Sequence, residues 1–239
     1  MDQRLVTQLV AINREFYSKF ADAFSETRSS AQTRLERIVA YIGDDVKALD
    51  VGCGNGRLAE RLEREHRRVQ YVGVDAAPEL IRIARAHNAQ TRFVAAEFFV
   101  GNLAQRDWHL ALPRDAFDVV VMLAVLHHLP SFELRATILR EARALLKPGG
   151  KLILTNWQFA HNERQQKRLV PWETIGLAAR DLEPGDALLA WKRGGVGFRF
   201  CHLITKDEMR QMAEQTGFSV LKQFFADADL NLYSVLEKS

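Results

Sequence analysis

Apolar residues along the chain follow two alternating patterns. Short apolar runs, namely VKALDV, VQYVGVD, TRFVAA, AFDVVVMLAVL and KLILTNW, are typical of strands buried within a sheet. The segments between them, such as RLAERLEREH, ELIRIARAHN and ELRATILREARALL, repeat their apolar positions every three to four residues, as amphipathic helices do. Strand and helix therefore alternate through five strands, and this order predicts a parallel sheet with helices on both faces.

Two more apolar runs, FSVLKQFFA and NLYSVLEK, follow the helical pattern KDEMRQMAEQT. They lie close enough in sequence to pair antiparallel. We therefore predict an α/β fold with a seven-stranded, mostly parallel, Rossmann-like sheet. Residues 1–239 are expected to form a single domain.

Two segments depart from this alternation. Residues 1–45 have helical periodicity and no strand pattern, so we predict an N-terminal helical cap. One face of its first helix carries Leu5, Leu9, Ile12, Phe16 and Phe20. Residues 158–200 are rich in charge, proline and glycine, and they predict a partly helical insertion after the fifth strand. Open α/β sheets bind ligands at the carboxyl ends of their strands, so we expect the insertion on the substrate side. Its Trp172 and Trp191 would form an exposed platform or cap a satellite core.

Composition narrows the possible partners only slightly. The 239 residues carry 33 basic and 30 acidic side chains, a net charge of +3, which is too small an excess to establish nucleic-acid binding. Basic residues do gather in and beside the insertion, where acidic residues dilute them: Arg164, Lys167, Arg168, Arg180, Lys192, Arg193 and Arg199. The two cysteines form no disulfide framework, and no His/Cys set has metal spacing, so we expect a reducing compartment and no metal. Without a signal-peptide core or a membrane-length apolar run, a cytoplasmic location away from membranes is expected.

The segment LDVGCGNGRLAERL carries the strongest chemical signal. Gly52, Gly54 and Gly56 follow a strand ending in Asp50 and lead directly into a helix. Glycines at such a turn let a ligand approach the backbone, and the helix N-terminus offers free N–H groups. The second strand ends in Asp75, 19 residues after Gly56, where an acid can accept both hydroxyls of a ribose. The combination predicts an adenosine-containing cofactor rather than a tight turn without a ligand.

The segment LDVGCGNG, the strand ending in Asp75 and the segment LLKPGGKLIL together resemble class I S-adenosylmethionine-dependent methyltransferases, over roughly residues 46–157. The resemblance implies S-adenosyl-L-methionine as the cofactor. It places the methionine end at Asp50, Gly52 and Gly54, the ribose at Asp75, and the adenine beside Ala76 and Glu97, where the family usually has aspartate. The complete set of cofactor-binding residues that it implies is Tyr17, Asp50, Gly52, Cys53, Gly54, Asp75, Ala76, Glu97, Phe98 and Leu123.

A narrower resemblance extends along almost the whole chain. The segments FYSKFADAFSETR, LAVLHHL, NW, LVPW, RFCHLITKDEM and NLY occur in the order found in tRNA methyltransferases that esterify a 5-carboxymethyl group on the wobble uridine. This resemblance implies a tRNA partner and, as in eukaryotic members, a small zinc-binding activator subunit. The implied active-site residues are His127, His128, Trp157 and Arg28, with Tyr17 closing over the cofactor. Arg199, His202 and Asn231 match further family positions.

Three departures from that family lie on the expected substrate side. Leu129 and Leu232 replace aromatic residues, and Phe200-Cys201 replaces an aromatic pair. The chemistry leaves the acceptor open as well, because a histidine suits both a carboxylate that needs a donor and a phenol or amine that needs a base. Two alternatives to the tRNA enzyme therefore remain: a small-molecule O- or N-methyltransferase, and a silent binding module. Since His127 and His128 are adjacent, at most one should face the cleft.

Overall fold

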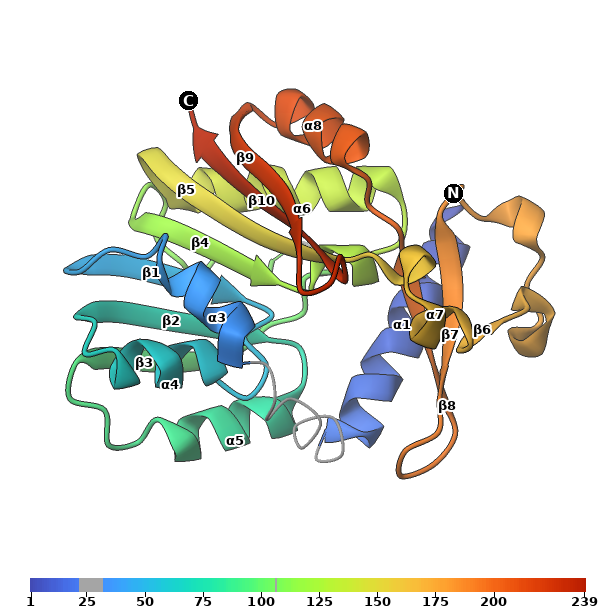
Figure 1. Ribbon diagram of the computed structural model, residues 1–239, viewed down its shortest axis with the longest axis horizontal. Helices are drawn as coiled ribbons and strands as arrows, with labels where there is room; N and C mark the ends of the chain where they lie inside the picture. Colours follow the sequence, from blue (N-terminus) through green and yellow to red (C-terminus); the bar gives the residue numbers. More distant parts are fainter. Residues whose placement is uncertain (22–31, 106) are drawn as a thin grey trace.

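The computed structural model describes residues 1–21, 32–105 and 107–239, with side chains left undescribed for 32–34. Its central sheet has seven strands in the order β3-β2-β1-β4-β5-β10-β9 (Figure 1). The first five run parallel, whereas β10 pairs antiparallel with both β5 and β9. The predicted fold class is therefore confirmed. The strands are β1 Val46–Val51, β2 Val69–Asp75, β3 Val94–Val100, β4 Phe117–Leu123, β5 Leu146–Trp157, β9 Phe218–Ala226 and β10 Asn231–Lys238.

Helices cover both faces of this sheet, and each face has its own apolar core. One core lies under α6 and α8, and the other lies under α3, α4 and α5. Neighbouring residues of β4 alternate between the cores, with Val120 in the first and Val119 and Val121 in the second. This two-sided burial explains why β4 is apolar throughout. The helices are α1 Gln3–Lys19, α3 Gln32–Val39, α4 Arg57–Arg64, α5 Pro78–His87, α6 Phe132–Leu145 and α8 Lys206–Gln215.

Strand β3 is displaced along the sequence from its predicted position. The run TRFVAA covers residues 91–96, whereas β3 extends from Val94 to Val100. The Glu63 carboxylate accepts the backbone N–H groups of Arg92, Phe93 and Val94, at 2.8–3.0 Å, and so holds the chain just before the strand. The carboxyl end of β3, at Val100, also comes later than predicted.

The insertion is built around a small antiparallel sheet rather than helices, so the partly helical prediction missed its main element. Strands β6 Leu169–Val170, β7 Asp186–Trp191 and β8 Gly197–His202 form this sheet, next to the carboxyl ends of the parallel strands (Figure 1). Helical structure within residues 158–200 is short. It comprises α7 Glu163–Gln166 and the 3-10 turns η2 Phe159–His161, η3 Trp172–Ile175 and η4 Ala179–Asp181.

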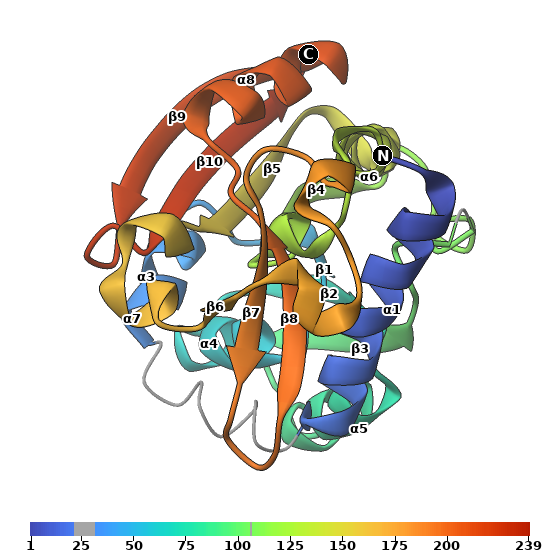
Figure 2. The same ribbon diagram turned by 90° about the vertical axis from the view of Figure 1, so that its right-hand side faces the viewer.

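Helix α1 covers the small sheet instead of the large one, as Figure 2 shows. Leu5 and Leu9 pack against Leu188 and Phe200, in a cluster that also contains Trp172. Trp191 packs in a second cluster, with Phe16 and Phe20. Both tryptophans therefore cap satellite cores, and the exposed-platform interpretation is wrong.

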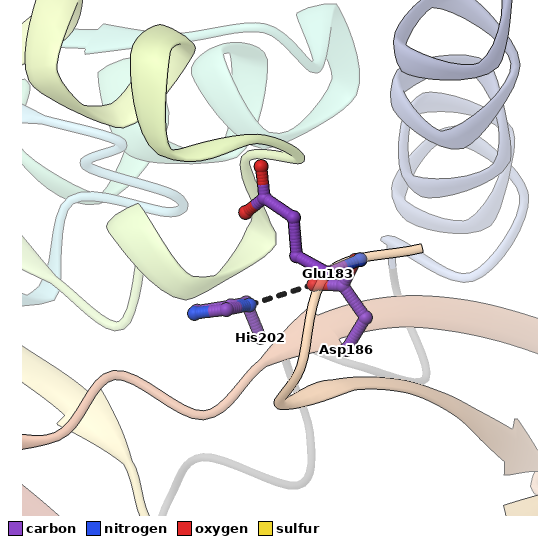
Figure 3. A group of neighbouring side chains, drawn as sticks. All are labelled: Glu183, Asp186 and His202. Carbon is purple, nitrogen blue, oxygen red and sulfur yellow. Dashed lines mark hydrogen bonds and ion pairs between the residues drawn. The ribbon is translucent and has the colours of Figure 1, made fainter. Parts of the chain in front are cut away.

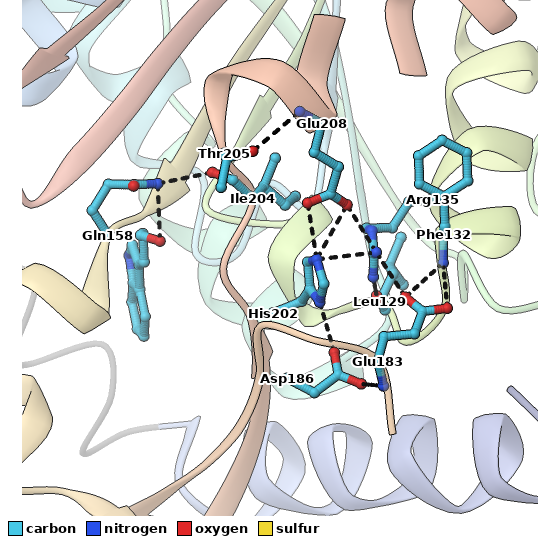
Figure 4. Close-up of polar contacts among 11 residues, drawn as sticks. Leu129, Phe132, Arg135, Gln158, Glu183, Asp186, His202, Ile204, Thr205 and Glu208 are labelled. Carbon is cyan, nitrogen blue, oxygen red and sulfur yellow. Dashed lines mark hydrogen bonds and ion pairs between the residues drawn. The ribbon is translucent and has the colours of Figure 1, made fainter. Parts of the chain in front are cut away.

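A buried ionic network holds the insertion against the main sheet. The Arg135 side chain of α6, which is 1% exposed, donates to Glu183 at 3.0 Å and to Glu208 of α8 at 2.9 Å (Figure 4). The imidazole of His202 donates from Nδ1 to Asp186 at 2.6 Å (Figure 3) and from Nε2 to Glu208 at 3.0 Å. Since Glu183 and Asp186 flank the start of β7, this network joins the insertion to two helices of the core.

No helix in the described ranges is long and apolar enough to cross a membrane.

The network predicts a pH-dependent contribution of His202 to stability. Burial acts to lower the pKa of His202, but the hydrogen bonds to Asp186 and Glu208 outweigh it and raise that pKa, although Arg135 lies nearby. A raised pKa stabilises the fold fully below the unfolded pKa of about 6.5, and the stabilisation is lost as the pH rises through the folded pKa. His202→Gln should lower the free energy of unfolding by up to about 3–5 kcal/mol at pH 6, because it leaves the buried Asp186 carboxylate without its cation, whereas Glu208 keeps Arg135.

Urea unfolding at pH 6, 7, 8 and 9 measures this difference, which should shrink with rising pH. His87→Gln is the matched control, since the His87–Glu60 pair is half-exposed and should contribute little. A His202→Gln effect of constant size from pH 6 to 9 would contradict the prediction.

Candidate active site

A cavity of about 810 Å³ lies at the carboxyl ends of the parallel strands. One end is formed by the glycine loop after β1 and the segment after β2. The other end is formed by α1, by the turn η1 Leu126–His128 after β4, and by the end of β5. The cavity therefore has two halves lined by different elements. Together they are large enough to hold a cofactor and an acceptor side by side.

The three positions of the loop require glycine for different structural reasons. A Cβ added at Gly54 would meet nothing within 4 Å, and Gly54 lines the cavity. At Gly52 the added Cβ would lie 2.3 Å from Val125 Cγ2, and at Gly56 it would lie 2.7 Å from Asn88 Nδ2. Gly52 and Gly56 are thus required by protein packing, whereas at Gly54 the missing side chain leaves space for a ligand.

Asp75 closes the loop from the end of β2. Its carboxylate accepts the backbone N–H of Gly54 at 2.9 Å and that of Ala77 at 2.9 Å. Asp75 also lines the cavity. The carboxylate thus fixes the glycine loop and faces the space where a ribose would bind.

Asp50 is a buried acid, and only one of its two carboxylate oxygens accepts a hydrogen bond from a described residue. Its Oδ2 accepts the Tyr71 hydroxyl at 2.5 Å, while its buried Oδ1 has no hydrogen-bond partner among the described residues. Burial raises the pKa of Asp50 to about 7. The hydrogen bond from Tyr71 acts to lower this pKa, and the negative charge of Asp75 acts to raise it further. Since Asp50 lines the cavity, an ammonium group placed there would satisfy the unpaired oxygen. The amino group of S-adenosylmethionine fits this requirement.

The adenine side differs from its prediction in two residues. Ala76 lines the cavity as expected, but Glu97 is exposed in the middle of β3, outside the cavity lining. Phe98 is buried beneath the loop, where its ring would meet a Cβ at either Gly56 or Gly73, so it supports the loop from below. The displaced end of β3 instead brings Asn102 into the cavity wall. Locating the end of β3 correctly would have revealed Asn102 from the sequence.

The histidine pair is divided between two tasks. His128 lines the cavity, and its Nε2 lies 2.8 Å from the Tyr17 hydroxyl. Its Nδ1 donates to the Phe200 carbonyl at 3.0 Å, so in the neutral ring Nε2 accepts from Tyr17. His127 is fully buried and packs on Trp157, with ring centroids 5.0 Å apart. The two imidazole rings remain in contact, with centroids 4.3 Å apart, but only His128 lines the cavity.

Trp157 is a wall of the cavity that the insertion supports from outside. Its indole lines the cavity, and the guanidinium carbon of Arg199 lies 4.9 Å from the ring centroid. Arg199 itself is buried and does not line the cavity. Arg28 lies outside the described residues.

The remaining matched positions are also placed. Leu123, Cys53 and Asn231 line the cavity, and Asn231 donates to Asp227 at 2.8 Å. His202 belongs to the ionic network instead. The sequence analysis did not identify three further lining residues, Asn13, Thr155 and Tyr233, which come from α1, β5 and β10.

Glu183, Asp186 and His202 place possible metal-ligand atoms within 4.8 Å of one another (Figure 3). Both nitrogens of His202 already face carboxylates, and Glu183 already accepts from Phe132 N and Arg135. Hydrogen bonding within the network thus accounts for this group without a metal.

Comparison with known proteins places the chain among methyltransferases. A family model described as methyltransferase domain matches residues 23–223. The chain is 25% identical to tRNA (carboxymethyluridine(34)-5-O)-methyltransferase of Schizosaccharomyces pombe, over 94% of this chain and 95% of that protein. It is 35% identical to ubiquinone biosynthesis O-methyltransferase of Xanthomonas axonopodis pv. citri, but only over 51% of this chain and 48% of that protein.

Solved structures show the same fold. S-adenosylmethionine-bound CalS10, an amino pentose methyltransferase from Micromonospora echinaspora, has a TM-score of 0.60 and 19% identity, over 91% of this chain and 96% of that one. A putative methyltransferase of Haloferax volcanii, solved in complex with the Trm112 methyltransferase activator, has a TM-score of 0.63 and 17% identity, over 93% and 97% of the two chains.

Binding of S-adenosylmethionine should release protons from Asp50. With a pKa of about 7, roughly half of the Asp50 carboxyls carry a proton at pH 7, and an ammonium beside them favours the ionised form. We expect a release of up to about half a proton at pH 7, falling toward zero by pH 9. Calorimetric titration in buffers of different ionisation enthalpy measures it. Asp50→Asn should abolish the release and Glu97→Gln should not; equal release from all three proteins would contradict the assignment.

Asp75→Ala should weaken S-adenosylmethionine binding at least tenfold. The change removes hydrogen bonds from ribose hydroxyls to a charged acceptor, each worth roughly 1.5–3 kcal/mol, and frees the Gly54 amide. The dissociation constant from calorimetry tests this, and a thermal melt checks that the variant folds. Unchanged affinity in a folded variant would rule out the ribose role.

Proposed function

The chain belongs to the methyltransferase-domain family and is an S-adenosylmethionine-dependent methyltransferase, and from this premise we propose that its acceptor is the carboxylate of a 5-carboxymethyl wobble uridine in tRNA. The observation that carries the proposal is similarity over nearly the full length of the fission-yeast tRNA enzyme, insertion included. The ubiquinone-pathway relative matches only about half of each chain. A tRNA substrate would place the enzyme in the cytoplasm.

The two halves of the cavity suit this reaction. S-adenosylmethionine supplies a methyl group on a sulfonium, an electrophile that a carboxylate oxygen can attack directly. A carboxylate has an ordinary pKa of about 4, so it is the nucleophile at neutral pH and needs no general base. The protein must hold the carboxylate and the methyl group in the reactive orientation, which can lower the activation barrier by on the order of 7–11 kcal/mol.

Tyr17 and His128 are the residues proposed to orient the acceptor. Because the Phe200 carbonyl fixes the His128 ring through Nδ1, its Nε2 and the Tyr17 hydroxyl keep a constant position at the cavity wall. Both groups can donate hydrogen bonds to a carboxylate when His128 is protonated. Arg14, Glu15 and Lys19 of α1 also line the cavity and together contribute one net positive charge to its wall. Trp157 excludes water from this end.

A small-molecule acceptor is the second candidate, favoured by the partial match to the ubiquinone-pathway O-methyltransferase. With a phenol as acceptor, His128 Nε2 would accept the hydroxyl proton as a general base. An activator subunit is a separate proposal, supported by the activator complex of the Haloferax volcanii protein of the same fold.

One assay separates these candidates. Purified protein and methyl-labelled S-adenosylmethionine are incubated with tRNA bearing 5-carboxymethyluridine, with the same tRNA bearing unmodified uridine, and with a metabolite extract. Each reaction is run with and without the Haloferax volcanii Trm112 activator. We expect label only in the first tRNA, as a base-labile ester. Label in the extract alone would replace the tRNA proposal by the small-molecule one.

His128→Ala should lower turnover about 100-fold while S-adenosylmethionine affinity stays within a few-fold, because losing one preorganised hydrogen-bonding group costs about that factor. Tyr17→Phe, which removes only the hydroxyl, should lower turnover in the same direction by a smaller factor. The control is His161→Ala, an exposed histidine of the insertion. Steady-state rates and calorimetry provide the two readouts; full activity of His128→Ala would eliminate the proposed role.

A further inference from the structure

Asp227 lies just behind the cavity wall and binds two residues that line it. Its side chain is 7% exposed, and its Oδ2 accepts the Asn231 amide at 2.8 Å and the Tyr233 hydroxyl at 2.7 Å. Its Oδ1 accepts the guanidinium of Arg37 on α3 at 2.5 Å. Asn231 and Tyr233 line the cavity, whereas Asp227 and Arg37 do not. One carboxylate therefore fixes two polar side chains of the wall at once.

The turn between β9 and β10 holds Asp227 in an uncommon backbone conformation. Asp227, Ala228 and Asp229 have φ angles of 60°, 54° and 58°, in the left-handed region that residues other than glycine seldom adopt. Such a conformation persists only where surrounding contacts stabilise it. Here these contacts are the side-chain bonds of Asp227 and the bond from the Gln158 N–H to the Leu230 carbonyl, at 2.9 Å. The fold thus keeps a strained turn in place, and this turn sets the position of the carboxylate.

A carboxylate only accepts hydrogen bonds, so Asp227 fixes the orientation of both partners. The Asn231 amide must turn its NH₂ group toward Asp227, which leaves its Oδ1 on the other side. Among the described residues no donor binds that oxygen, and the oxygen is not fully buried. Burial and the hydrogen bond to Asp227 raise the pKa of Tyr233, so its hydroxyl keeps the proton that it donates, and its oxygen can accept. This part of the wall therefore offers acceptor oxygens to a ligand.

Strand register places these oxygens beside the residues proposed to bind the acceptor. In the antiparallel pair of β5 and β10, Asn231 lies directly opposite Trp157, and Tyr233 lies opposite Thr155. Opposite residues project from the same face of a sheet, and all four line the cavity. The Trp157 ring centroid lies 5.4 Å from that of His128. The acceptor oxygens therefore belong to the half of the cavity that is proposed to hold the methyl acceptor.

We propose that Asn231 selects the nucleobase by accepting its ring N–H through Oδ1, and that Asp227 is the positioning residue that keeps this oxygen turned toward the base. This proposal rests on the tRNA function proposed above. A base that enters an enzyme pocket is read by hydrogen bonds to its Watson–Crick edge. Uracil carries a proton at N3 on this edge, whereas N3 of cytosine is an acceptor and would face the Asn231 oxygen without a hydrogen bond. Such a mismatch between buried polar groups weakens binding by roughly ten- to a hundredfold.

The test measures selectivity between two substrates that carry the same carboxylate. The protein methylates tRNA with 5-carboxymethyluridine or with 5-carboxymethylcytidine at the wobble position, with the Haloferax volcanii Trm112 activator present. The readout is the ratio of kcat/KM for the two substrates, and the native chain should prefer the uridine at least about tenfold. Asn231→Ala should bring this ratio to within about threefold of one, because it removes the selecting oxygen. Asp227→Asn should also lower the ratio, since an amide there can donate to Asn231 and let its side chain turn over.

Asp229→Asn is the matched control, because it removes an exposed acid from the same turn, and it should keep the native ratio. Thermal melts check that the variants fold. Variants of Asn231 and Asp227 that lower both rates at a constant ratio, or a native chain without preference, would overturn the base selection and leave the tRNA function standing. If the native chain methylates neither tRNA, the tRNA function is wrong and the base selection with it.

Discussion

The pairing of Arg135 with carboxylates from two other segments is the interaction on which the acceptor half of the cavity depends. Glu183 lies just before β7 and His202 ends β8, so the network sets the position of the small sheet relative to α6 and α8. That sheet in turn carries the Phe200 carbonyl, which orients His128, and the Phe200 backbone, which binds Asn13 of α1. Tyr17 follows one turn later and meets His128. A buried ionic contact just behind the cavity wall, where Arg135 also donates to the carbonyl of the lining residue Leu129, thus determines the geometry of the residues that face the acceptor.

The sequence could predict the cofactor half of the site because its information is local. Asp50, Gly54 and Asp75 each stand at the end of a strand or in the turn after it, and strand order alone brings them together. The prediction for Glu97 failed because it required the exact bounds of β3, and the start of this strand is held by Glu63 of α4, which accepts three backbone N–H groups there. A single sequence carries no pattern for such a cap.

For the acceptor half, the sequence could predict which residues are candidates but not where their side chains lie. His127 and His128 were candidates together, and only the 3-10 turn and the Phe200 carbonyl distinguish them. Strands β7 and β8 are short apolar runs within a charged segment, so the sequence alone did not reveal their pairing or the helix α1 that covers them. Trp172 and Trp191 look exposed in a polar segment for the same reason. Long-range packing decides burial there, and periodicity does not report it.

The contact between Asn13 and Phe200 joins residues 187 positions apart in the chain. During synthesis α1 emerges before β8, so the surface that it covers does not exist until β8 has left the ribosome. Closing so long a loop carries an entropic cost, and contacts of this separation form slowly. The apolar face of the amphipathic helix α1 therefore stays exposed to solvent while the parallel strands assemble. The nascent chain would therefore complete its cofactor pocket before its acceptor pocket. Helix α1 precedes the cofactor-binding strands in the sequence but would take its final position after them.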